Sequence, residues 1–241
     1  MDELSRIVLY TLFAGACIPL GGLLACHERI HPAWLETEFR HFIIAFGGGI
    51  LVAAVALVLV PDGMAYVDHS MLGVLVFVGG GAVFFALERF LGARRREKPQ
   101  LMAMLLDYVP ESLALGGAFA IDAPSASLLA LFIGLQNLPE GFNACRELCA
   151  AQGAGHRWRV LRFMLLLVPI GPVVAVMGWA WFGGESFLLG SVMLFASGGI
   201  LYLIFQDIAP QSHMQRHWAP PLGAVLGFGA GLLGKMLVVG G

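Results

Sequence analysis

The sequence predicts an all-α integral membrane protein, a single polytopic membrane domain (residues 1–241) with eight transmembrane helices. Three observations predict this class: an apolar composition, eight long apolar segments and two internal repeats. Of the 241 residues, 59% are hydrophobic and only 12% are charged, and the mean hydropathy is +0.82. Soluble domains average about 45–50% apolar and about 25% charged residues. The composition therefore excludes a soluble enzyme, and a formal net charge of -2 offers no basic surface for nucleic acid.

Eight segments have the length and apolar character of transmembrane helices, which need about 20 predominantly apolar residues. Short connections join them. Because the segments are longer and more continuous than the roughly 10-residue alternating strands of a membrane β-barrel, helices are predicted. The predicted spans are residues 7–26, 41–60, 71–91, 101–121, 125–147, 160–182, 187–207 and 220–239.

The distribution of Lys and Arg predicts how these spans are oriented. If the N-terminus lies outside, all but two of the 14 Lys and Arg residues fall on the inner side, the exceptions being Arg6 and Lys235. Membrane proteins carry such an excess on the cytoplasmic side. We therefore expect a multi-pass protein of the plasma or inner membrane, embedded in the lipid bilayer, with both termini outside.

An internal repeat relates the first three spans to the last three. At an offset of 150 residues, Ile-Pro-Leu-Gly at 18–21 matches Val-Pro-Ile-Gly at 168–171, and Gly-Gly-Ile-Leu at 48–51 recurs at 198–201. Because an odd number of spans separates the partners, the two halves have opposite orientations. With the fourth and fifth spans between them, this gives a 3+2+3 arrangement with an inverted repeat, an architecture of many secondary transporters.

The two central spans carry a second repeat of polar residues. At an offset of 29, Asp-Tyr-Val-Pro-Glu at 107–111 matches Gln-Asn-Leu-Pro-Glu at 136–140. Residues four apart share a helix face, so Asp107 lies on the same face as Glu111, and Gln136 lies on the same face as Glu140. A charge in the bilayer core costs about 2.5 kcal/mol or more on insertion scales. Oxygen ligands with net negative charge suit a cation.

A proline lies inside each polar motif. A proline within a helix removes a backbone hydrogen bond and clashes with the carbonyl four residues earlier. Pro110 and Pro139 therefore predict kinks that free the carbonyl groups of Leu106 and Leu135. Freed carbonyls at membrane depth belong where backbone lines a cavity or binds an ion. A purely structural Glu–Gln cluster is the alternative, although such contacts contribute only about 0.6 kcal/mol in membranes.

The paired motifs resemble those of the ZIP (Zrt-/Irt-like) metal transporters, whose fourth helix reads H-N-x-P-E-G and whose fifth carries a similar motif. The eight spans, the outward termini and the 3+2+3 repeat resemble that family too. The resemblance implies a homodimeric transporter rather than an enzyme. Its substrate is a divalent metal ion such as Zn, Mn, Fe, Co or Cd, moved toward the cytosol without an organic cofactor. The metal ligands that the resemblance implies are Asp107, Glu111, Gln136, Asn137 and Glu140.

This sequence departs from the ZIP pattern at both motif histidines. Asp107 and Gln136 stand in their places, and Tyr108 replaces the usual Asn. Histidine nitrogen suits Zn²⁺, whereas oxygen ligands favour Mn²⁺, Fe²⁺ or Mg²⁺ more. We therefore expect a relaxed or non-zinc preference. A non-transporting metal binder or scaffold and a proton or monovalent-cation pathway remain alternatives; an intramembrane aspartic protease would need a G-x-G-D segment, which the sequence lacks.

Two further groups are candidate stations for a cation at the membrane surfaces. Histidine pairs four residues apart on the inner side can hold a divalent ion, although solvated interface histidines are the alternative. The candidate inner exit site comprises His27, His31, His213 and His217. Acidic residues outside could concentrate cations, or simply follow from the bias of Lys and Arg toward the inner side. The candidate outer entrance comprises Asp62, Asp68, His69 and Asp122.

Small residues complete the pattern. Gly223, Gly227 and Gly231 in the eighth span are spaced four apart, which allows close backbone contact, either inside the chain or at a dimer seam. Internal packing is the favoured interpretation. No cysteine belongs to a C-x-x-C pair, so we interpret them as small buried residues or free thiols. They are Cys17, Cys26, Cys145 and Cys149.

Overall fold

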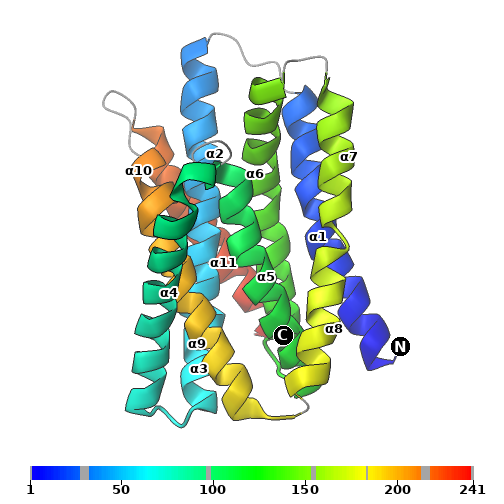
Figure 1. Cartoon of the computed structure of the whole chain (residues 1–241), viewed down its shortest axis with the longest axis vertical. Coiled ribbons are helices and arrows are strands. Elements are labelled where there is room, and N and C mark those ends of the chain that lie inside the picture. The colour runs from blue at the N-terminus through cyan, green and yellow to red at the C-terminus, as the bar shows by residue number, and fades with distance from the viewer. Residues whose placement is uncertain are drawn as a thin grey trace.

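The computed structural model describes residues 2–27, 33–95, 99–152, 156–182, 184–212 and 218–239, and these are helical without any strand. The described helices form long rods that run side by side along the molecule (Figure 1). The first four rods are α1 (Glu3–His27), α2 (Ala33–Ala54) with the π-helical segment η1 (Val55–Leu59) and α3 (Val60–Tyr66), α4 (Met71–Arg95), and α5 (Pro99–Ala120). The next four are α6 (Ala126–Gln152), α7 (Arg157–Leu167) with α8 (Ile170–Phe182), α9 (Ser186–Leu203) with η3 (Ile204–Ile208) and α10 (Ala209–Gln211), and α11 (Ala219–Val239).

Six of the described rods are long and apolar enough to cross a membrane. Helices α5 and α6 are not among them, because the polar residues of the two central motifs lower their apolar character. These features are those of a multi-pass membrane protein, and they confirm the predicted all-helical class. The six segments are Glu3–His27, Thr37–Tyr66, Met71–Phe90, Arg157–Phe182, Ser186–Gln211 and Ala219–Val238.

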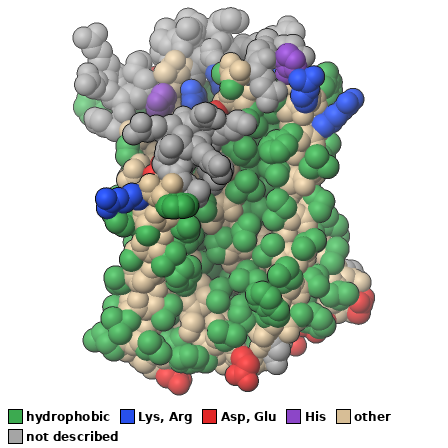
Figure 2. All heavy atoms as spheres, viewed as in Figure 1, with side chains coloured by type: hydrophobic (Ala, Val, Ile, Leu, Met, Phe, Trp, Pro, Cys, Tyr) green, Lys and Arg blue, Asp and Glu red, His purple; other side chains and the backbone are tan. Residues whose placement is uncertain are grey.

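The two ends of the molecule differ in charge. The start of α1, the end of α11 and the connections α3–α4, α5–α6 and α8–α9 all lie toward one end (Figure 1). Figure 2 shows the main groups of Asp and Glu side chains at that end, Lys and Arg side chains at the other, and a broad hydrophobic surface between them. We name these the acidic end and the basic end. The start of α1 and the end of α11 therefore share the acidic end.

The helix pairings place α5 and α6 among the other rods. Helix α1 packs on α6, α5 on α8, α2 on α11 and α4 on α9, while α5 and α6 also contact each other. The outer rods are α4 and α11, in which only 17% and 22% of the apolar stretch is buried, against 67% in the α2–α3 rod and 61% in the α9–α10 rod. The polar motifs thus lie on helices that are shielded by their neighbours.

Prolines explain where the rods lose regular α-helical geometry. Segment η1 precedes Pro61 and η3 precedes Pro210, and the α7–α8 rod is interrupted at Val168 and Pro169. Pro61 cannot donate to the carbonyl of Leu57, four residues earlier. Lys235 Nζ on α11 donates to that oxygen instead, over 3.2 Å. Helices α5 and α6, in contrast, continue through their own prolines.

Gly223, Gly227 and Gly231 of α11 face α2, so this row packs inside the chain. A methyl group at Gly223 would come 2.5 Å from the carbonyl oxygen of Phe42, and one at Gly227 would overlap the carbonyl oxygen of Phe46. Backbones approach this closely only where a side chain is missing. Gly229, two residues along the same helix, has open space around it.

Replacing Gly227 with alanine should destabilise the protein, because the new methyl group has to displace backbone rather than a mobile side chain. Overpacking of this kind costs typically about 1–3 kcal/mol. The midpoint of thermal unfolding in detergent, followed by tryptophan fluorescence, should fall for Gly227→Ala. Gly229→Ala makes the same chemical change where nothing opposes it and should unfold like the wild type; equal midpoints for the two variants would contradict the observed α2–α11 contact.

Candidate metal centre

The polar centre begins with a direct contact between α5 and α6. Gln136 Nε2 on α6 donates a hydrogen bond to Glu111 Oε2 on α5, and both side chains are fully buried. Apolar residues of the core flank Glu111 on both sides along α5, and they precede Gln136 on α6 at Phe132 and Ile133. A carboxylate buried this deeply is costly unless its charge is balanced.

Three carboxyl groups act on one another in this centre. Asp107 lies one turn before Glu111 on α5, is only 3% exposed, and accepts a hydrogen bond from the Tyr108 backbone N–H at 3.0 Å. The negative charges of Asp107 and Glu111 are both near enough to act on the half-buried Glu140 of α6. Such a group is stable only if protons or a cation offset the repulsion.

Five buried amide and carboxyl oxygen atoms on these two helices have no hydrogen-bond donor within the described part of the chain. Buried polar atoms in folded proteins almost always have a partner, and an unsatisfied one costs about 1–3 kcal/mol. All five are acceptors, so the missing groups are donors or cations. The atoms are Glu111 Oε1, Gln136 Oε1, Asn137 Oδ1, Glu140 Oε2 and Asn143 Oδ1.

The amide groups of Asn137 and Asn143 are oriented through their nitrogen atoms. Asn137 Nδ2 donates to the carbonyl oxygen of Ala14 on α1, and Asn143 Nδ2 donates to that of Pro139, both over 2.9 Å. Because the NH₂ groups are engaged, each oxygen is left as a free acceptor. Carboxylate, amide and carbonyl oxygens are the ligands of hard divalent cations.

A small polar cavity of about 20 Å³ borders Glu140 and Asn143 where α6 meets α2 and η3, with Gly47, Gly48 and Ile208 among its other walls. A site of this size is large enough for a single water molecule or ion. Asn143 is not among the ligands predicted from the sequence. Its position, three residues after Glu140 and seven after Gln136, places it on the same helix face, so the helical period could have found it.

Tyr108 occupies a packing position rather than an open ligand position. Its side chain is buried, and its hydroxyl lies against Gly15 of α1 and Gly171 of α8, where an added methyl group would meet it. The residue therefore fills the seam between α1 and α8.

The candidate surface stations are placed only in part. His27 is exposed at the end of α1, with Nδ1 2.9 Å from the carbonyl oxygen of Leu23. The other three residues of the candidate inner exit lie outside the described residues: His31, His213 and His217.

The four residues of the candidate outer entrance lie at or near connections of the acidic end. Asp68 and His69 form the α3–α4 corner with φ of 54° and 50°, Asp122 forms the α5–α6 turn with φ of 49°, and Asp62 is half-buried on α3. Within the described ranges, no three His, Cys, Asp or Glu side chains are gathered to hold a metal ion. Any metal site in the central motifs thus needs the amide oxygens as well.

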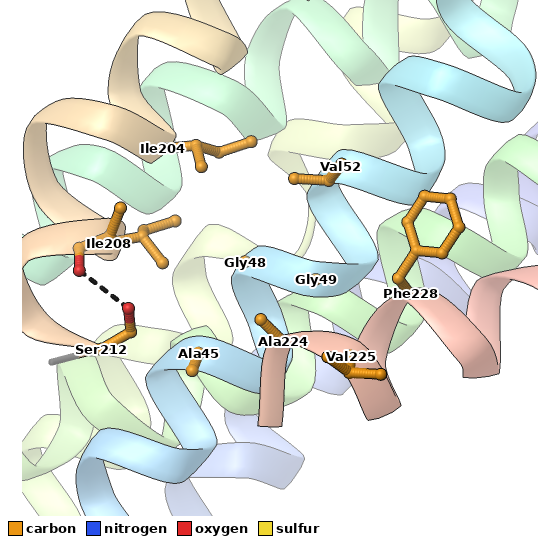
Figure 3. A pocket seen from close by; sticks show the side chains of 11 residues that line it. Ala45, Gly48, Gly49, Val52, Ile204, Ile208, Ser212, Ala224, Val225 and Phe228 are labelled. Carbon is orange, nitrogen blue, oxygen red and sulfur yellow. Dashed lines mark hydrogen bonds between the residues drawn. The ribbon is translucent and has the colours of Figure 1, made fainter. Parts of the chain in front are cut away.

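A larger cavity of about 390 Å³ lies beside the polar one but offers no ligand of its own. It is lined by α2, η3, α10 and α11, and Gly48 and Ile208 border both spaces (Figure 3). Its hydroxyl group, Ser212 Oγ, donates to the carbonyl oxygen of Ala209 over 2.8 Å. The cavity is therefore an apolar groove, and Glu140 and Asn143 line only the small space on the α6 side.

Comparison with known proteins gives one relative that bears on function. No family model matches the chain. The chain is 38% identical over 114 residues to the zinc transporter GufA of Myxococcus xanthus. The aligned segment covers 47% of this chain and 44% of the relative, so the match spans less than half of either protein.

Proposed function

We propose that this protein is a ZIP-like membrane transporter that carries a divalent metal cation through an oxygen-ligand site on α5 and α6. The observation that carries the proposal is the set of five buried acceptor oxygens without donors beside three interacting carboxyl groups. A bound divalent cation would satisfy the oxygens and offset the negative charge together. The proposed ligands are Asp107, Glu111, Gln136, Asn137 and Glu140, and Asn143 joins them.

The relative supports transport rather than catalysis. Its name is that of a zinc transporter, and the chain combines six membrane-length apolar helices with two long helices that carry the polar motifs. We propose a metal ion as the transported substrate and no enzymatic activity. Because Asp107 and Gln136 supply oxygen where histidine would supply nitrogen, we propose that Mn²⁺ or Fe²⁺ competes effectively with Zn²⁺.

The proposed arrangement is eight transmembrane helices in a 3+2+3 order with an inverted repeat. The helix pairings support it. In an inverted repeat, α1 corresponds to the α7–α8 rod, α2 to α9, α4 to α11 and α5 to α6. The contact of α1 with α6 then corresponds to that of α8 with α5, and the contact of α2 with α11 to that of α9 with α4. All four contacts are present. The two π-helical segments, each followed by a proline, also occupy corresponding places. In such folds, the substrate site lies at the repeat interface.

The remaining features of the proposal follow the ZIP resemblance and the charge bias. The acidic end faces outward with both termini, the basic end faces the cytosol, and the cation moves from the first to the second in the plasma or inner membrane. The protein works as a homodimer. Asp62, Asp68 and Asp122, with His69 beside them, form an entrance that attracts cations, and His27 contributes to an exit site at the other end.

Metal uptake into proteoliposomes tests this function. Purified protein is reconstituted, and entry of Zn²⁺, Mn²⁺, Fe²⁺, Co²⁺ and Cd²⁺ is measured against protein-free vesicles, with a pH-sensitive dye inside to follow protons. We expect saturable uptake of at least two of these metals. Metal binding without uptake would replace the transporter with a metal-binding scaffold, and proton or Na⁺ flux without divalent uptake would replace it with a monovalent pathway.

A further inference from the structure

Three cysteine thiols form a chain where α1 meets α6 near the basic end. Cys145 of α6 is buried, and its Sγ lies 3.8 Å from Cys26 Sγ of α1 and 3.9 Å from Cys149 Sγ of α6. Cys26 is 119 residues from Cys145 in the sequence, so the fold alone creates this cluster. All three are free thiols, and Cys26 and Cys149 are half-buried rather than sealed.

The spacing of the sulfur atoms suits a thiolate metal site. Two thiolates bound tetrahedrally to one ion at about 2.3 Å lie ~3.8 Å apart. Both S···S distances in the cluster agree with this separation of two thiolates on one ion, whereas a disulfide brings the sulfur atoms to about 2.05 Å. Within the described ranges no three such side chains are already arranged to hold a metal ion. A three-thiolate site therefore requires the Cys149 side chain to rotate toward the pair that Cys26 and Cys145 form.

This cluster is separate from the oxygen centre on α6. Cys145 and Cys149 lie on the side of the helix toward α1, as does Gly141, whose backbone abuts the carbonyl of Ile18. Glu140 and Asn143 instead border the cavity toward α2 and η3. The two groups also differ in chemistry, because thiolates select soft cations and carboxylate or amide oxygens select hard ones.

We propose that Cys26, Cys145 and Cys149 form a second metal site, which binds a soft cation such as Cd²⁺ or Zn²⁺ between α1 and α6. Each sulfur binds as a thiolate, so every thiol that joins the site releases one proton to solvent. The bound ion links the end of α1 to α6 through sulfur, at the point where Arg157 Nη1 of α7 already donates to the Cys26 carbonyl oxygen over 3.3 Å. The site therefore lets soft metals act on the helix that carries half of the oxygen centre, without entering that centre.

Titration of the reduced, purified protein with Cd²⁺ tests the thiol site without any transport measurement. Sulfur-to-metal charge transfer gives an ultraviolet absorption that oxygen ligands do not give. We expect this band to saturate near one Cd²⁺ per chain. Cys145→Ser and, independently, Cys26→Ser should weaken Cd²⁺ binding at this band at least tenfold. Cys17→Ser is the matched control, because the Cys17 thiol of α1 lies outside the cluster and donates to the carbonyl oxygen of Phe13, at 3.5 Å.

Two further measurements separate this site from folding defects and from the oxygen centre. Maleimide labelling in the wild type should be suppressed by Cd²⁺ at Cys26 and Cys149 but not at Cys17, and this requires no substitution. A Glu111→Gln, Glu140→Gln double variant should retain the band. Absence of the band in reduced wild type, its persistence in Cys145→Ser, or its loss in the double variant would overturn the proposal; failure of metal uptake would leave it standing.

Discussion

Glu111→Gln should lower the initial rate of divalent metal uptake by at least about tenfold. The substitution keeps the shape of the side chain and one carbonyl oxygen, but it removes the negative charge from a fully buried ligand position. Mutation of a residue that only hydrogen-bonds to a metal ligand typically lowers metal affinity or activity by about 10–100-fold. Loss of a charged residue that binds the metal directly should lower it at least as much. Glu140→Gln should act in the same direction. Uptake is measured in proteoliposomes at metal concentrations below saturation.

Glu185→Gln is the matched control for this prediction. Glu185 is an exposed carboxylate just before α9 at the acidic end, so the same chemical change occurs far from the central motifs. It should leave uptake within about twofold of the wild type. Isothermal titration of each variant in detergent separates binding from movement. Wild-type uptake by folded Glu111→Gln would remove this carboxylate from the cation path.

The positions of the helices followed from the sequence because the bilayer makes strong demands on composition. Each of the eight predicted apolar segments overlaps a helical rod, since about 20 apolar residues are needed to cross the hydrocarbon core. The ends agree less well. Helix α1 begins at Glu3 rather than near residue 7, and α4 continues to Arg95 rather than 91. Helical hydrogen bonding continues into polar residues, so hydropathy marks the apolar part of a helix, not the whole helix.

The breaks in the rods were harder to predict than the rods themselves. Pro110 and Pro139, where the sequence predicts kinks, lie inside helices that continue past them, whereas Pro61 and Pro210 follow π-helical segments. The difference depends on which neighbours accept the strain and satisfy the freed carbonyl, as Lys235 does for Leu57. That information lies in tertiary contacts rather than in the local sequence.

Candidate ligands on the same helix could be predicted from their spacing in the sequence. Contacts between residues on different helices could not, because they depend on how the helices pack. The four-residue spacing within each motif identified Asp107 with Glu111 and Gln136 with Glu140. The hydrogen bond between Gln136 and Glu111 joins the two helices and follows only from their packing. The thiol cluster is a stronger case, because nothing local relates Cys26 to Cys145. Asn143, in contrast, continues the α6 face by one turn.

Gln136→His should shift the preference of the site toward Zn²⁺. Gln136 is fully buried and touches Glu111, so an imidazole at this position would meet the same carboxylate and present a nitrogen to the cation. Nitrogen ligands suit Zn²⁺, and oxygen ligands suit Mn²⁺. We expect the ratio of Zn²⁺ to Mn²⁺ uptake to rise about tenfold, the lower end of the effects that changes around metal sites have on affinity. The ratio is measured with both metals competing in one vesicle preparation.

Gln206→His makes the same exchange on the exposed face of η3 and should leave that ratio unchanged. Asp107→His extends the test to α5, where histidine replaces a charged oxygen ligand rather than a neutral one. It should therefore raise the Zn²⁺ to Mn²⁺ ratio but reduce the total uptake of both metals, because the site loses a negative charge. An unchanged ratio in folded Gln136→His would mean that the cation does not approach this residue, and the metal path would then have to lie nearer Glu140 and Asn143, on the cavity side of α6.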